Sequence, residues 1–286
     1  IVFGDWSSDV CSSDLSENYA WSYQDIDYSG TPGGTFDLEL DSQGLPHIAY
    51  YSPSENKLLY RAFNGSEWEL QHEIFGNMNY VSLELDANDR PHITYYITTS
   101  GGAYYTAWDG SSWLSPITIG TFQQNHGQYA SLALSDGGIP HVAYNDFQNA
   151  SLKLAVLQGG VFVSQIVDDN IPTGGAFNYI SLALDANDTP HIAYCAGAAL
   201  DTCTELRYAT WSGGWEREIV DSTAGAGYNT SLAISSIAQP HILYRIPGSS
   251  LQYTYKDGST WEKAEMDSDT SRSEEHTSEL QSPNTI

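Results

Sequence analysis

A short string of residues recurs five times along this chain and limits the folds that it can adopt. Pro-His-apolar-x-Tyr begins at Pro46, Pro91, Pro140, Pro190 and Pro240, so successive copies lie 45, 49, 50 and 50 residues apart. A near-constant period of this length is typical of repeat architectures, in which each unit is one supersecondary structure stacked on its neighbours. The chain is therefore expected to be built from similar units.

Each repeat contains four short segments in which apolar and polar residues alternate. In the fourth repeat these segments are SLALD, PHIAY, LRYATW and WEREIVD. Alternation with a period of two predicts strands, and the Gly, Asn and Asp residues between the segments predict tight turns. Helix signals are nearly absent. We call the four expected strands of a unit a, b, c and d, in chain order.

Four antiparallel strands repeated at this spacing predict an all-β fold, a β-propeller of four-stranded antiparallel blades. Five repeats are expected, over residues 31–76, 77–120, 121–169, 170–222 and 223–268. A lone four-stranded sheet exposes two apolar faces, and stacking the blades around an axis buries both. The aromatic residues that open strand d are expected to pack between blades: Trp68, Trp113, Phe162, Trp215 and Trp261.

The two ends of the chain do not fit the repeat. A DNA strand that encodes Asp5–Leu15 has a reverse complement that encodes Arg272–Ser282. Unrelated protein tails would not share this relation, and the DNA resembles a sequencing adapter. We therefore expect residues 1–15 and 272–286 to be adapter-derived and exclude them from the fold prediction. The propeller is then expected to span residues 16–271.

One expected strand has no unit of its own. Residues 20–28, with the string WSYQDID, match a fourth strand but follow no a, b or c strand. This orphan outer strand predicts either the remnant of a further blade or a displaced strand of a closed five-blade ring.

The net charge of the chain limits the classes of partner that it can bind. Ten Lys and Arg stand against 36 Asp and Glu, a formal net charge of -26. So acidic a protein repels phosphate backbones and anionic headgroups, which argues against nucleic acid and membrane surfaces as partners. No apolar run reaches the ~18 residues of a membrane-spanning helix. We expect a monomer without a cofactor or bound metal.

The repeat SLALDANDTPHIAY…LRYATWSGGWEREIVD resembles the bacterial sialidase-like, or neuraminidase-repeat (Asp-box), propellers. The Asp-box is Ser-x-Asp-x-Gly-x-x-Trp on the c–d turn, and the nearest matches here are Thr106–Trp113 and Thr254–Trp261. Asp and Gly are adjacent in both, so the box is degenerate. The resemblance covers nearly all of residues 16–271 and implies the propeller fold.

The resemblance does not carry sialidase catalysis with it. Sialidases hold the substrate carboxylate with three arginines and use a Tyr/Glu pair plus an Asp. Residues 16–271 contain five arginines, namely Arg61, Arg90, Arg207, Arg217 and Arg245. Only Arg245, at the end of strand b, is placed for a central site. Asp146 and Arg245 are the only charged breaks in the repeat near that site, and they remain weak catalytic candidates.

Two repeated features are polar and invite a metal-binding hypothesis. The five histidines of the Pro-His strings are His47, His92, His141, His191 and His241. They begin strand b, on the side opposite the loops that usually carry function, so a structural role once per blade is favoured over a metal site. The turns Asp86–Asp89 and Asp185–Asp188 carry Asp and Asn oxygens without a downstream Glu, which favours plain turns over calcium loops.

Two cysteines lie close together in the fourth repeat. Cys195 and Cys203 flank a b–c loop that is longer than its counterparts. A disulfide between them would stiffen this loop and would indicate an oxidising compartment. The alternative is two free thiols.

The loops that join d to a, together with the b–c loops, are expected to carry the function. They are rich in Asn, Gln, Gly and Tyr and poor in Lys and Arg, which suits neutral sugars, because amides bond hydroxyls and aromatic faces stack on sugar C–H groups. The expected ligand-binding residues are Asn79, Tyr80, Gln123, Asn125, His126, Tyr129, Asn178, Tyr179, Tyr228 and Asn229.

The sequence thus favours an extracellular, lectin-like propeller that binds a neutral glycan or a cell-surface polysaccharide. One alternative is a sialidase-like or other glycan-active enzyme with a central site, for which paired carboxylates such as Asp146 with Asp168, Asp169 or Asp201 would be needed. A protein-interaction scaffold is the second alternative.

Overall fold

The computed structural model describes residues 25–26, 35–120, 126–170, 175–200, 202–248 and 250–267. Twenty strands and one short 3₁₀ helix, Phe147–Asn149, make up its regular structure, so the predicted all-β class is confirmed. The strands form five four-stranded antiparallel sheets, each a simple meander of consecutive strands. We call these sheets blades 1 to 5. The two end segments and most of the orphan strand, all but Asp25 and Ile26, lie outside the described residues.

The bounds of the strands follow the repeat. Blade 1 comprises β1 (Phe36–Leu40), β2 (Pro46–Ser52), β3 (Lys57–Phe63) and β4 (Trp68–Phe75). Blade 2 comprises β5 (Met78–Leu85), β6 (Pro91–Ile97), β7 (Gly102–Ala107) and β8 (Ile117–Ile119). Blade 3 comprises β9 (His126–Leu134), β10 (Pro140–Asp146), β11 (Ser151–Gln158) and β12 (Val161–Asp168). Blade 4 comprises β13 (Ala176–Leu184), β14 (Pro190–Gly197), β15 (Glu205–Trp211) and β16 (Trp215–Asp221). Blade 5 comprises β17 (Tyr228–Ile234), β18 (Pro240–Ile246), β19 (Ser250–Asp257) and β20 (Thr260–Asp267).

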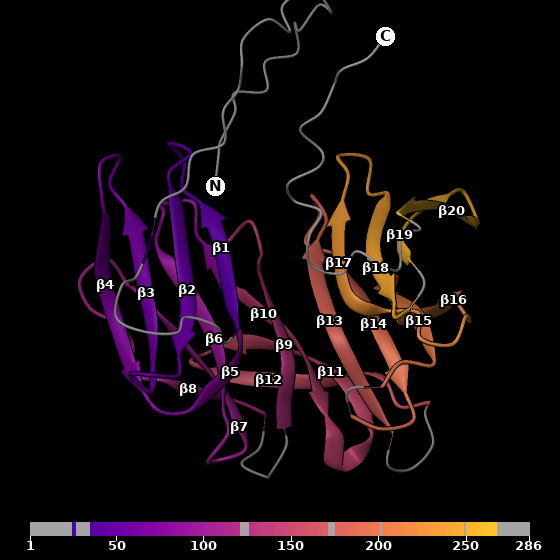
Figure 1. Cartoon of the computed structure of the whole chain (residues 1–286), viewed down its shortest axis with the longest axis horizontal. Coiled ribbons are helices and arrows are strands. Elements are labelled where there is room, and N and C mark those ends of the chain that lie inside the picture. The colour runs from indigo at the N-terminus through magenta and orange to yellow at the C-terminus, as the bar shows by residue number, and fades with distance from the viewer. Residues whose placement is uncertain are drawn as a thin grey trace, which may run out of the picture.

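The blades stand side by side around an axis, with strand a of each innermost. Figure 1 shows the five blades in an arc, with indigo blade 1 and orange-to-yellow blade 5 at its two ends. The inner strands pack in chain order, β1 on β5, β5 on β9, β9 on β13 and β13 on β17. Among the described residues, β17 and β1 share no comparable contact.

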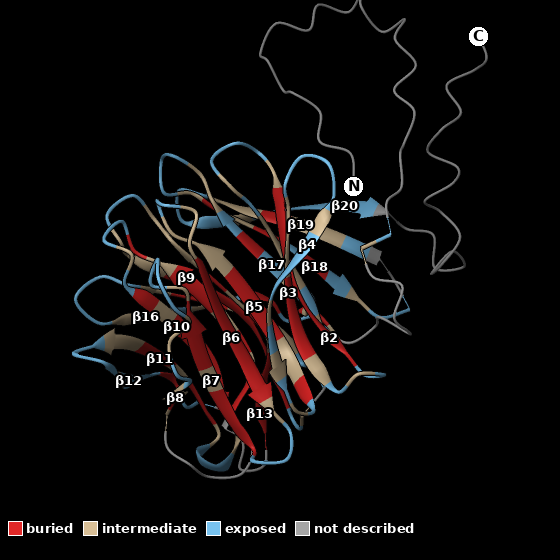
Figure 2. Ribbon diagram, turned by 90° about the vertical axis from the view of Figure 1, so that its left-hand side faces the viewer, coloured by how far each residue is buried: buried red, intermediate tan, exposed pale blue. Residues whose placement is uncertain are grey.

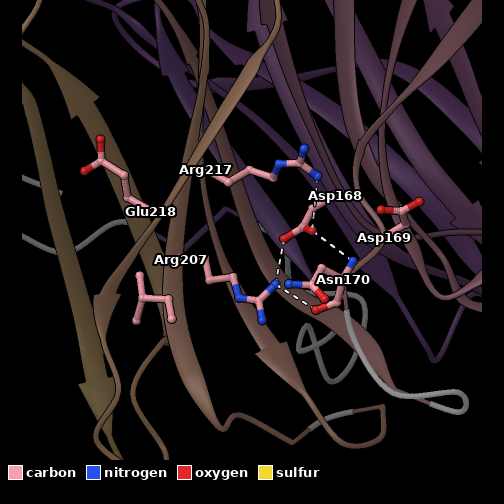
Figure 3. A pocket seen from close by; sticks show the side chains of 7 residues that line it. Asp168, Asp169, Asn170, Arg207, Arg217 and Glu218 are labelled. Carbon is pink, nitrogen blue, oxygen red and sulfur yellow. Dashed lines mark hydrogen bonds and ion pairs between the residues drawn. The ribbon is translucent and has the colours of Figure 1, made fainter.

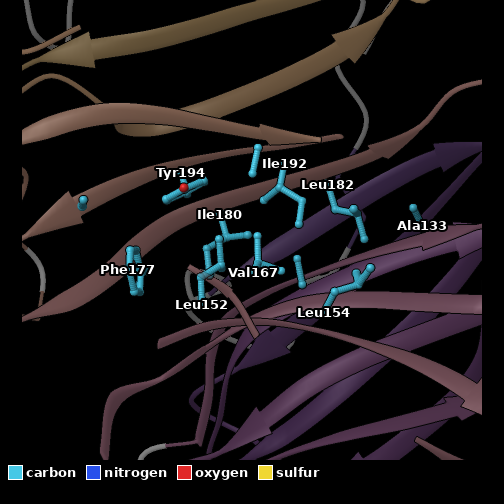
Figure 4. Packing of buried hydrophobic residues seen from close by; sticks show 12 residues of the cluster. Ala133, Leu152, Leu154, Val167, Phe177, Ile180, Leu182, Ile192 and Tyr194 are labelled. Carbon is cyan, nitrogen blue, oxygen red and sulfur yellow. The ribbon is translucent and has the colours of Figure 1, made fainter. Parts of the chain in front are cut away.

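Apolar residues fill the space between adjacent blades. Between blades 3 and 4, for example, Leu152, Leu154 and Val167 pack against Ile192 and Tyr194, as Figure 4 shows. The middle strands b and c are the most buried, and the outer strands d are the most exposed. In Figure 2, β6 and β7 are mostly red, whereas β12 and β16 are largely tan and pale blue. The repeat therefore stabilises itself by the burial of apolar area between units.

An edge-on aromatic contact joins three of the four pairs of consecutive blades. Trp113 lies edge-on to Tyr60 of blade 1, with ring centroids 5.7 Å apart. Trp261 meets Tyr208 of blade 4 in the same way at 5.2 Å. Phe162 packs edge-on against a tyrosine of blade 2 at 5.5 Å. These three residues, and Trp215 at the core between blades 3 and 4, pack between blades as predicted. Trp113 does so from a position before the short strand β8, and Trp68 packs against residues of its own blade.

A polar contact repeats at the inner edge, where strand a leaves backbone N–H groups without a ladder partner. The N–H of Leu182 in blade 4 donates to the Ser131 hydroxyl of blade 3 at 3.0 Å. The N–H of Leu232 donates to the Ser181 hydroxyl at 3.0 Å. Blades 2 and 3 make the same bond, and between blades 1 and 2 an Asp37 carboxylate oxygen is the acceptor. These side chains satisfy edge donors that would otherwise be buried without an acceptor.

The repeated histidines have structural partners. A hydrogen bond joins Nδ1 of His92 and the Tyr105 hydroxyl at 2.6 Å, and three other histidines bond a strand-c tyrosine in the same way. In blade 3 the corresponding strand-c residue is Leu154, so Nδ1 of His141 pairs with the Ile139 carbonyl instead. Each histidine therefore serves its own blade.

The Asp-Asn strings form plain turns. A carboxylate oxygen of Asp86 accepts hydrogen bonds from the N–H groups of Asn88 and Arg90, and Asp185 closes the equivalent turn in blade 4. These side chains mimic a backbone turn, which is the ordinary role of Asp in such loops.

Candidate functional site

The topology sorts the loops onto two ends of the propeller. In a meander, the d–a and b–c loops lie at one end of the strands, and the a–b and c–d turns lie at the other. The Pro-His histidines start strand b and so lie at the turn end. We call the opposite end, with the d–a and b–c loops, the loop end.

Four tyrosines on successive inner strands come together near the loop end. Tyr80 on β5, Tyr129 on β9, Tyr179 on β13 and Tyr228 on β17 form a continuous series of ring contacts. Their centroids are 4.5, 4.9 and 5.0 Å apart in order along the series. All four side chains are partly exposed. We call this group the tyrosine arc.

The backbone beneath the arc is unusual. Tyr80, Tyr129 and Tyr179 have φ values of 52°, 55° and 49°, in the left-handed region that residues other than glycine seldom adopt. Each lies where the a–b register shifts, that is, in a β-bulge. Such a conformation costs on the order of 1 kcal/mol and persists where the fold enforces it, often at ligand sites. From these bulges the three rings contact one another across the blades.

In blade 5 the tyrosine of the arc is not the residue with the positive φ. There Asn229 is the residue with positive φ, at 51°, and Tyr228 precedes it. The pair Tyr228-Asn229 therefore reverses the Asn178-Tyr179 order of blade 4, yet the Tyr228 ring still meets Tyr179. In blade 1 the corresponding residue is Thr35, whose hydroxyl accepts a hydrogen bond from a blade 2 backbone N–H. The arc thus ends at blade 2.

The other residues that the sequence predicted to bind ligand do not form one group in the structure. Asn79 is partly buried beside Tyr80, and Asn229 is exposed. Asn178 is fully buried, and its amide donates to the carbonyl oxygens of Ala199 and Thr202 at 3.3 and 2.9 Å, so it holds the b–c loop of blade 4. His126 begins β9. Gln123 and Asn125 lie outside the described residues.

The same b–c loop carries a disulfide. Cys195 at the end of β14 is bonded to Cys203, with Cα atoms 5.5 Å apart. The chain of blade 5 passes close by, because a Cβ placed on Gly227 would lie 3.1 Å from the Cβ of Cys195. Gly227 has a φ of 104°, which a larger residue resists. The disulfide and Asn178 therefore support the backbone from which Tyr228 projects.

The two catalytic candidates do not form a site. Asp146 is fully buried, lies 2.5 Å from the Lys153 ammonium and caps the 3₁₀ helix by accepting from the Asn149 N–H. Arg245 is exposed on blade 5, two blades away. Asp146 thus has structural partners, and Asp201 lies outside the described part of the chain.

A concave pocket opens between the outer strands of blades 3 and 4. Its volume is about 650 Å³, and its walls are formed by Asp168, Asp169, Asn170, Arg207, Arg217, Glu218 and Ile219. Figure 3 shows the Asp168 carboxylate between the two guanidinium groups. We call this the blade 3–4 pocket.

Asp168 is the centre of that pocket and is itself buried. It accepts hydrogen bonds from Arg207 and from the Tyr194 hydroxyl, each at 2.8 Å, and lies 3.7 Å from Arg217. The arrangement recurs between blades 4 and 5, where Asp221 accepts from Tyr244 and lies 3.2 Å from a lysine. Asp168 therefore locks two blades together, and the partly exposed Arg217 is the donor that faces the opening.

Three carboxylates gather on the inner strands of blades 1 and 2. Burial, together with the nearby Glu39 and Asp37 carboxylates, raises the pKa of Glu84 to about 8. Burial, together with Asp37, also raises the pKa of Glu39 to about 7. Glu84 and Glu39 therefore bind protons in the neutral pH range. Within the described residues, no group of three or more His, Cys, Asp or Glu side chains has the geometry of a metal site. No helix in the same part of the chain is long and apolar enough to span a membrane.

Sequence reasoning found the tyrosines but not the contacts between them, and it did not find the blade 3–4 pocket. One signal for the pocket was available. Arg207 pairs with Ile219 and Ala209 pairs with Arg217, so a c–d hairpin places both arginines on one face of the sheet. What the sequence could not give is the identity of the facing carboxylate, which belongs to another repeat.

Comparison with solved structures supports the fold. No family model and no curated protein matches the sequence. A six-bladed β-propeller, the fungal lectin of Aleuria aurantia, has a TM-score of 0.57 at 14% identity, covering 80% of this chain and 76% of that one. The SapL1 lectin bound to α-methyl fucoside scores 0.55 at 13% identity over 82% and 81%. A Penicillium chrysogenum α-L-arabinanase with arabinobiose scores 0.55 at 9% identity over 80% and 79%.

At these identities the likeness concerns the fold alone. The propeller part of the predicted resemblance is confirmed, whereas no family model supports the sialidase-like repeat itself. With its five meander sheets packed in order around an axis, the chain has the β-propeller fold.

Proposed function

We propose that this chain is a carbohydrate-binding propeller and that the tyrosine arc is its binding surface for neutral glycans. The observation that carries the proposal is the arc itself, four partly exposed rings brought together from four blades. Three of them stand on backbone that the fold holds in an unfavourable conformation. Aromatic faces that stack on sugar C–H groups, with hydroxyls at their rims, are suited to neutral sugars.

The charge of the protein supports a neutral rather than an anionic ligand. At a net charge of -26, an acidic polysaccharide would be repelled on approach. The Aleuria aurantia lectin is a six-bladed β-propeller that recognises fucose, and the SapL1 lectin was solved with α-methyl fucoside, which makes a sugar ligand compatible with this fold. The Cys195–Cys203 disulfide favours an oxidising, extracellular location, where a cell-surface polysaccharide is a suitable partner.

The test is a titration of the protein with neutral oligosaccharides by calorimetry, after a glycan array has selected them. Tyr129→Ala removes a central ring of the arc and is expected to weaken binding roughly three- to tenfold. Tyr129→Phe keeps the ring and should lose less. Trp211→Ala is the matched control, because it removes an aromatic side chain that is 40% exposed and lies at the turn end, away from the arc.

Two outcomes contradict the proposal. A folded, monomeric protein that binds no neutral glycan on the array rules out the ligand class. Equal weakening by Tyr129→Ala and Trp211→Ala rules out the arc. Product formation from a bound oligosaccharide would favour the glycan-active enzyme instead.

A further inference from the structure

Blade 5 exposes a sheet face that the other blades bury. In blade 4, Ala193, Leu206 and Tyr208 lie in the core that blade 5 covers. Strand pairing identifies their counterparts in blade 5 as Leu243, Leu251 and Tyr253. Leu243 and Leu251 are 38% and 39% exposed, and the Tyr253 side chain is partly exposed. We call these three residues the blade 5 face.

The polar contact between blades also stops at blade 5. Ser181 accepts a hydrogen bond from the Leu232 N–H of the following blade. Ser231 is the next member of this series, and it is exposed. No backbone N–H of a following blade reaches it within the described part of the chain.

The aromatic contact stops at the same place. Tyr60, Tyr105 and Tyr208 each contact an aromatic ring from the part of the following blade that comes after its strand c. Tyr253 is the equivalent of Tyr208, and within the described residues its ring contacts are with His241 and Tyr255 of its own blade. Blade 5 thus carries the residues for three kinds of contact with a following blade: apolar, polar and aromatic. None of them has a partner from a following blade within the described residues.

At the other end of the row of blades, the outward face of blade 1 is already covered. Ile48, Tyr50 and Leu59, on the rear face of blade 1, are buried, and Ile26 packs against them. In the same way, Val220 at the end of β16 packs on the equivalent face of blade 5. Ile26 therefore occupies the place of a strand-d residue from a preceding blade, which agrees with the match of residues 20–28 to strand d.

These contacts select one occupant. A second copy cannot dock its blade 1 on the blade 5 face through the usual contacts, because the rear face of blade 1 is covered by its own Ile26. Two blade 5 faces brought together would both present the accepting side of these contacts, so neither would supply the backbone N–H or the aromatic ring of a following blade. A further unit of the repeat supplies the backbone N–H, the apolar side chains and the aromatic ring that these contacts need.

We propose that the blade 5 face is a docking surface for one further unit of this same repeat, a sixth blade in which Ile26 takes the place of a strand-d residue. Its strand a offers a backbone N–H to Ser231, and its strand b places Ile or Val and Tyr on Leu243 and Leu251. The aromatic that opens its strand d meets Tyr253. A six-bladed ring is also the architecture of the Aleuria aurantia lectin, with which the fold agrees.

The test extends the chain after Asp267 with a second copy of residues 222–257, which contains a d–a loop and strands a, b and c. The extended protein should remain monomeric by light scattering, bind less of the dye ANS and melt at least about 5 °C higher than the parent. An unchanged melting temperature together with unchanged ANS binding overturns the proposal, as does a parent that is a dimer through the blade 5 face.

Matched variants keep the test decisive even if the extension fails to fold. Leu243→Lys should leave the melting temperature of the parent unchanged, because the side chain faces solvent, and should abolish the gain in the extended protein. Ala193→Lys, at the buried counterpart in blade 4, should destabilise both. If Leu243→Lys lowers the parent melting temperature as much as Ala193→Lys does, the blade 5 face is already covered and the proposal is wrong. Glycan binding plays no part in these readouts.

Discussion

The Ser131 hydroxyl in blade 3 accepts a hydrogen bond from the backbone N–H of Leu182 in blade 4, at 3.0 Å. The two residues lie 51 positions apart and make a contact that recurs from blade to blade. It solves a general problem of the fold, since the innermost strand of every blade has one edge without a ladder partner.

Replacement of this hydroxyl should therefore cost stability. Ser131→Ala leaves the Leu182 N–H without its acceptor, for which we expect a loss of about 1–3 kcal/mol in the free energy of unfolding, measured by urea denaturation. Ser231→Ala is the control, because no following N–H meets that hydroxyl in the described chain, and it should change the free energy by less than about 0.5 kcal/mol. Equal losses in the two variants would contradict the structural role of the contact.

The histidines provide a second pair of matched variants. His92→Ala removes the partner of the buried Tyr105 hydroxyl and should destabilise the protein by about 1–3 kcal/mol. His141→Ala removes only a bond to the nearby Ile139 carbonyl, and should cost less. A metal-dependent melting temperature that disappears in either variant would contradict the structural assignment.

His92 also gives a pH dependence. Burial lowers its pKa below the ordinary value of 6.5. In the pH range between the lowered pKa and 6.5, the unfolded chain binds more protons than the folded one, so stability falls as pH decreases through this range. The slope of unfolding free energy against pH below 6.5 should therefore be smaller in His92→Ala.

The inner carboxylates predict the opposite slope at higher pH. Because the pKa of Glu84 is raised to about 8, the folded protein holds a proton that the unfolded chain has released above about pH 4.5. This contribution to stability is complete below pH 4.5 and is lost as pH rises to about 8. Glu84→Gln should stabilise the protein at pH 8 by on the order of 1–2 kcal/mol and have little effect at pH 4.5. Glu69→Gln, on the exposed outer strand of blade 1, should change neither value.

The disulfide closes a short loop and should contribute accordingly. Replacement of Cys195 and Cys203 by Ser should lower the free energy of unfolding by about 2–3 kcal/mol, the chain-entropy value for a loop of this size. Dithiothreitol should reduce the melting temperature of the parent but not of the double variant. If reductant shifts both equally, the effect does not arise from this bond.

The two arginines of the blade 3–4 pocket separate a structural from a surface role. Arg207→Met leaves the buried Asp168 without a 2.8 Å partner and should cost about 3 kcal/mol, whereas Arg217→Met breaks only a 3.7 Å contact of a side chain that is 42% exposed and should cost less than about 1 kcal/mol. Neither should weaken neutral-glycan binding at the arc. If Arg217→Met abolishes binding while the protein stays folded, the ligand site is the pocket.

The all-β class, the strand order of each unit and the structural role of the repeated histidines could all be predicted from local sequence patterns. Period-two alternation and turn residues act locally, within a few positions, so a single repeat such as residues 176–221 carries them in full. Repetition also marked exceptions, including the longer b–c loop with Cys195 and Cys203. Local chemistry of this kind can be recognised without coordinates.

Contacts between residues of different repeats could be identified only in the folded protein. Tyr80 and Tyr129 lie 49 positions apart, and a bulge with positive φ turns each ring toward the next, which no local pattern encodes. The partnership of Asp168 with Arg207 and the exposure of Leu243 also depend on which blade follows which. Contacts between repeats are set by the rotation from one blade to the next, and that rotation results from packing over the whole interface rather than from any one segment of the chain.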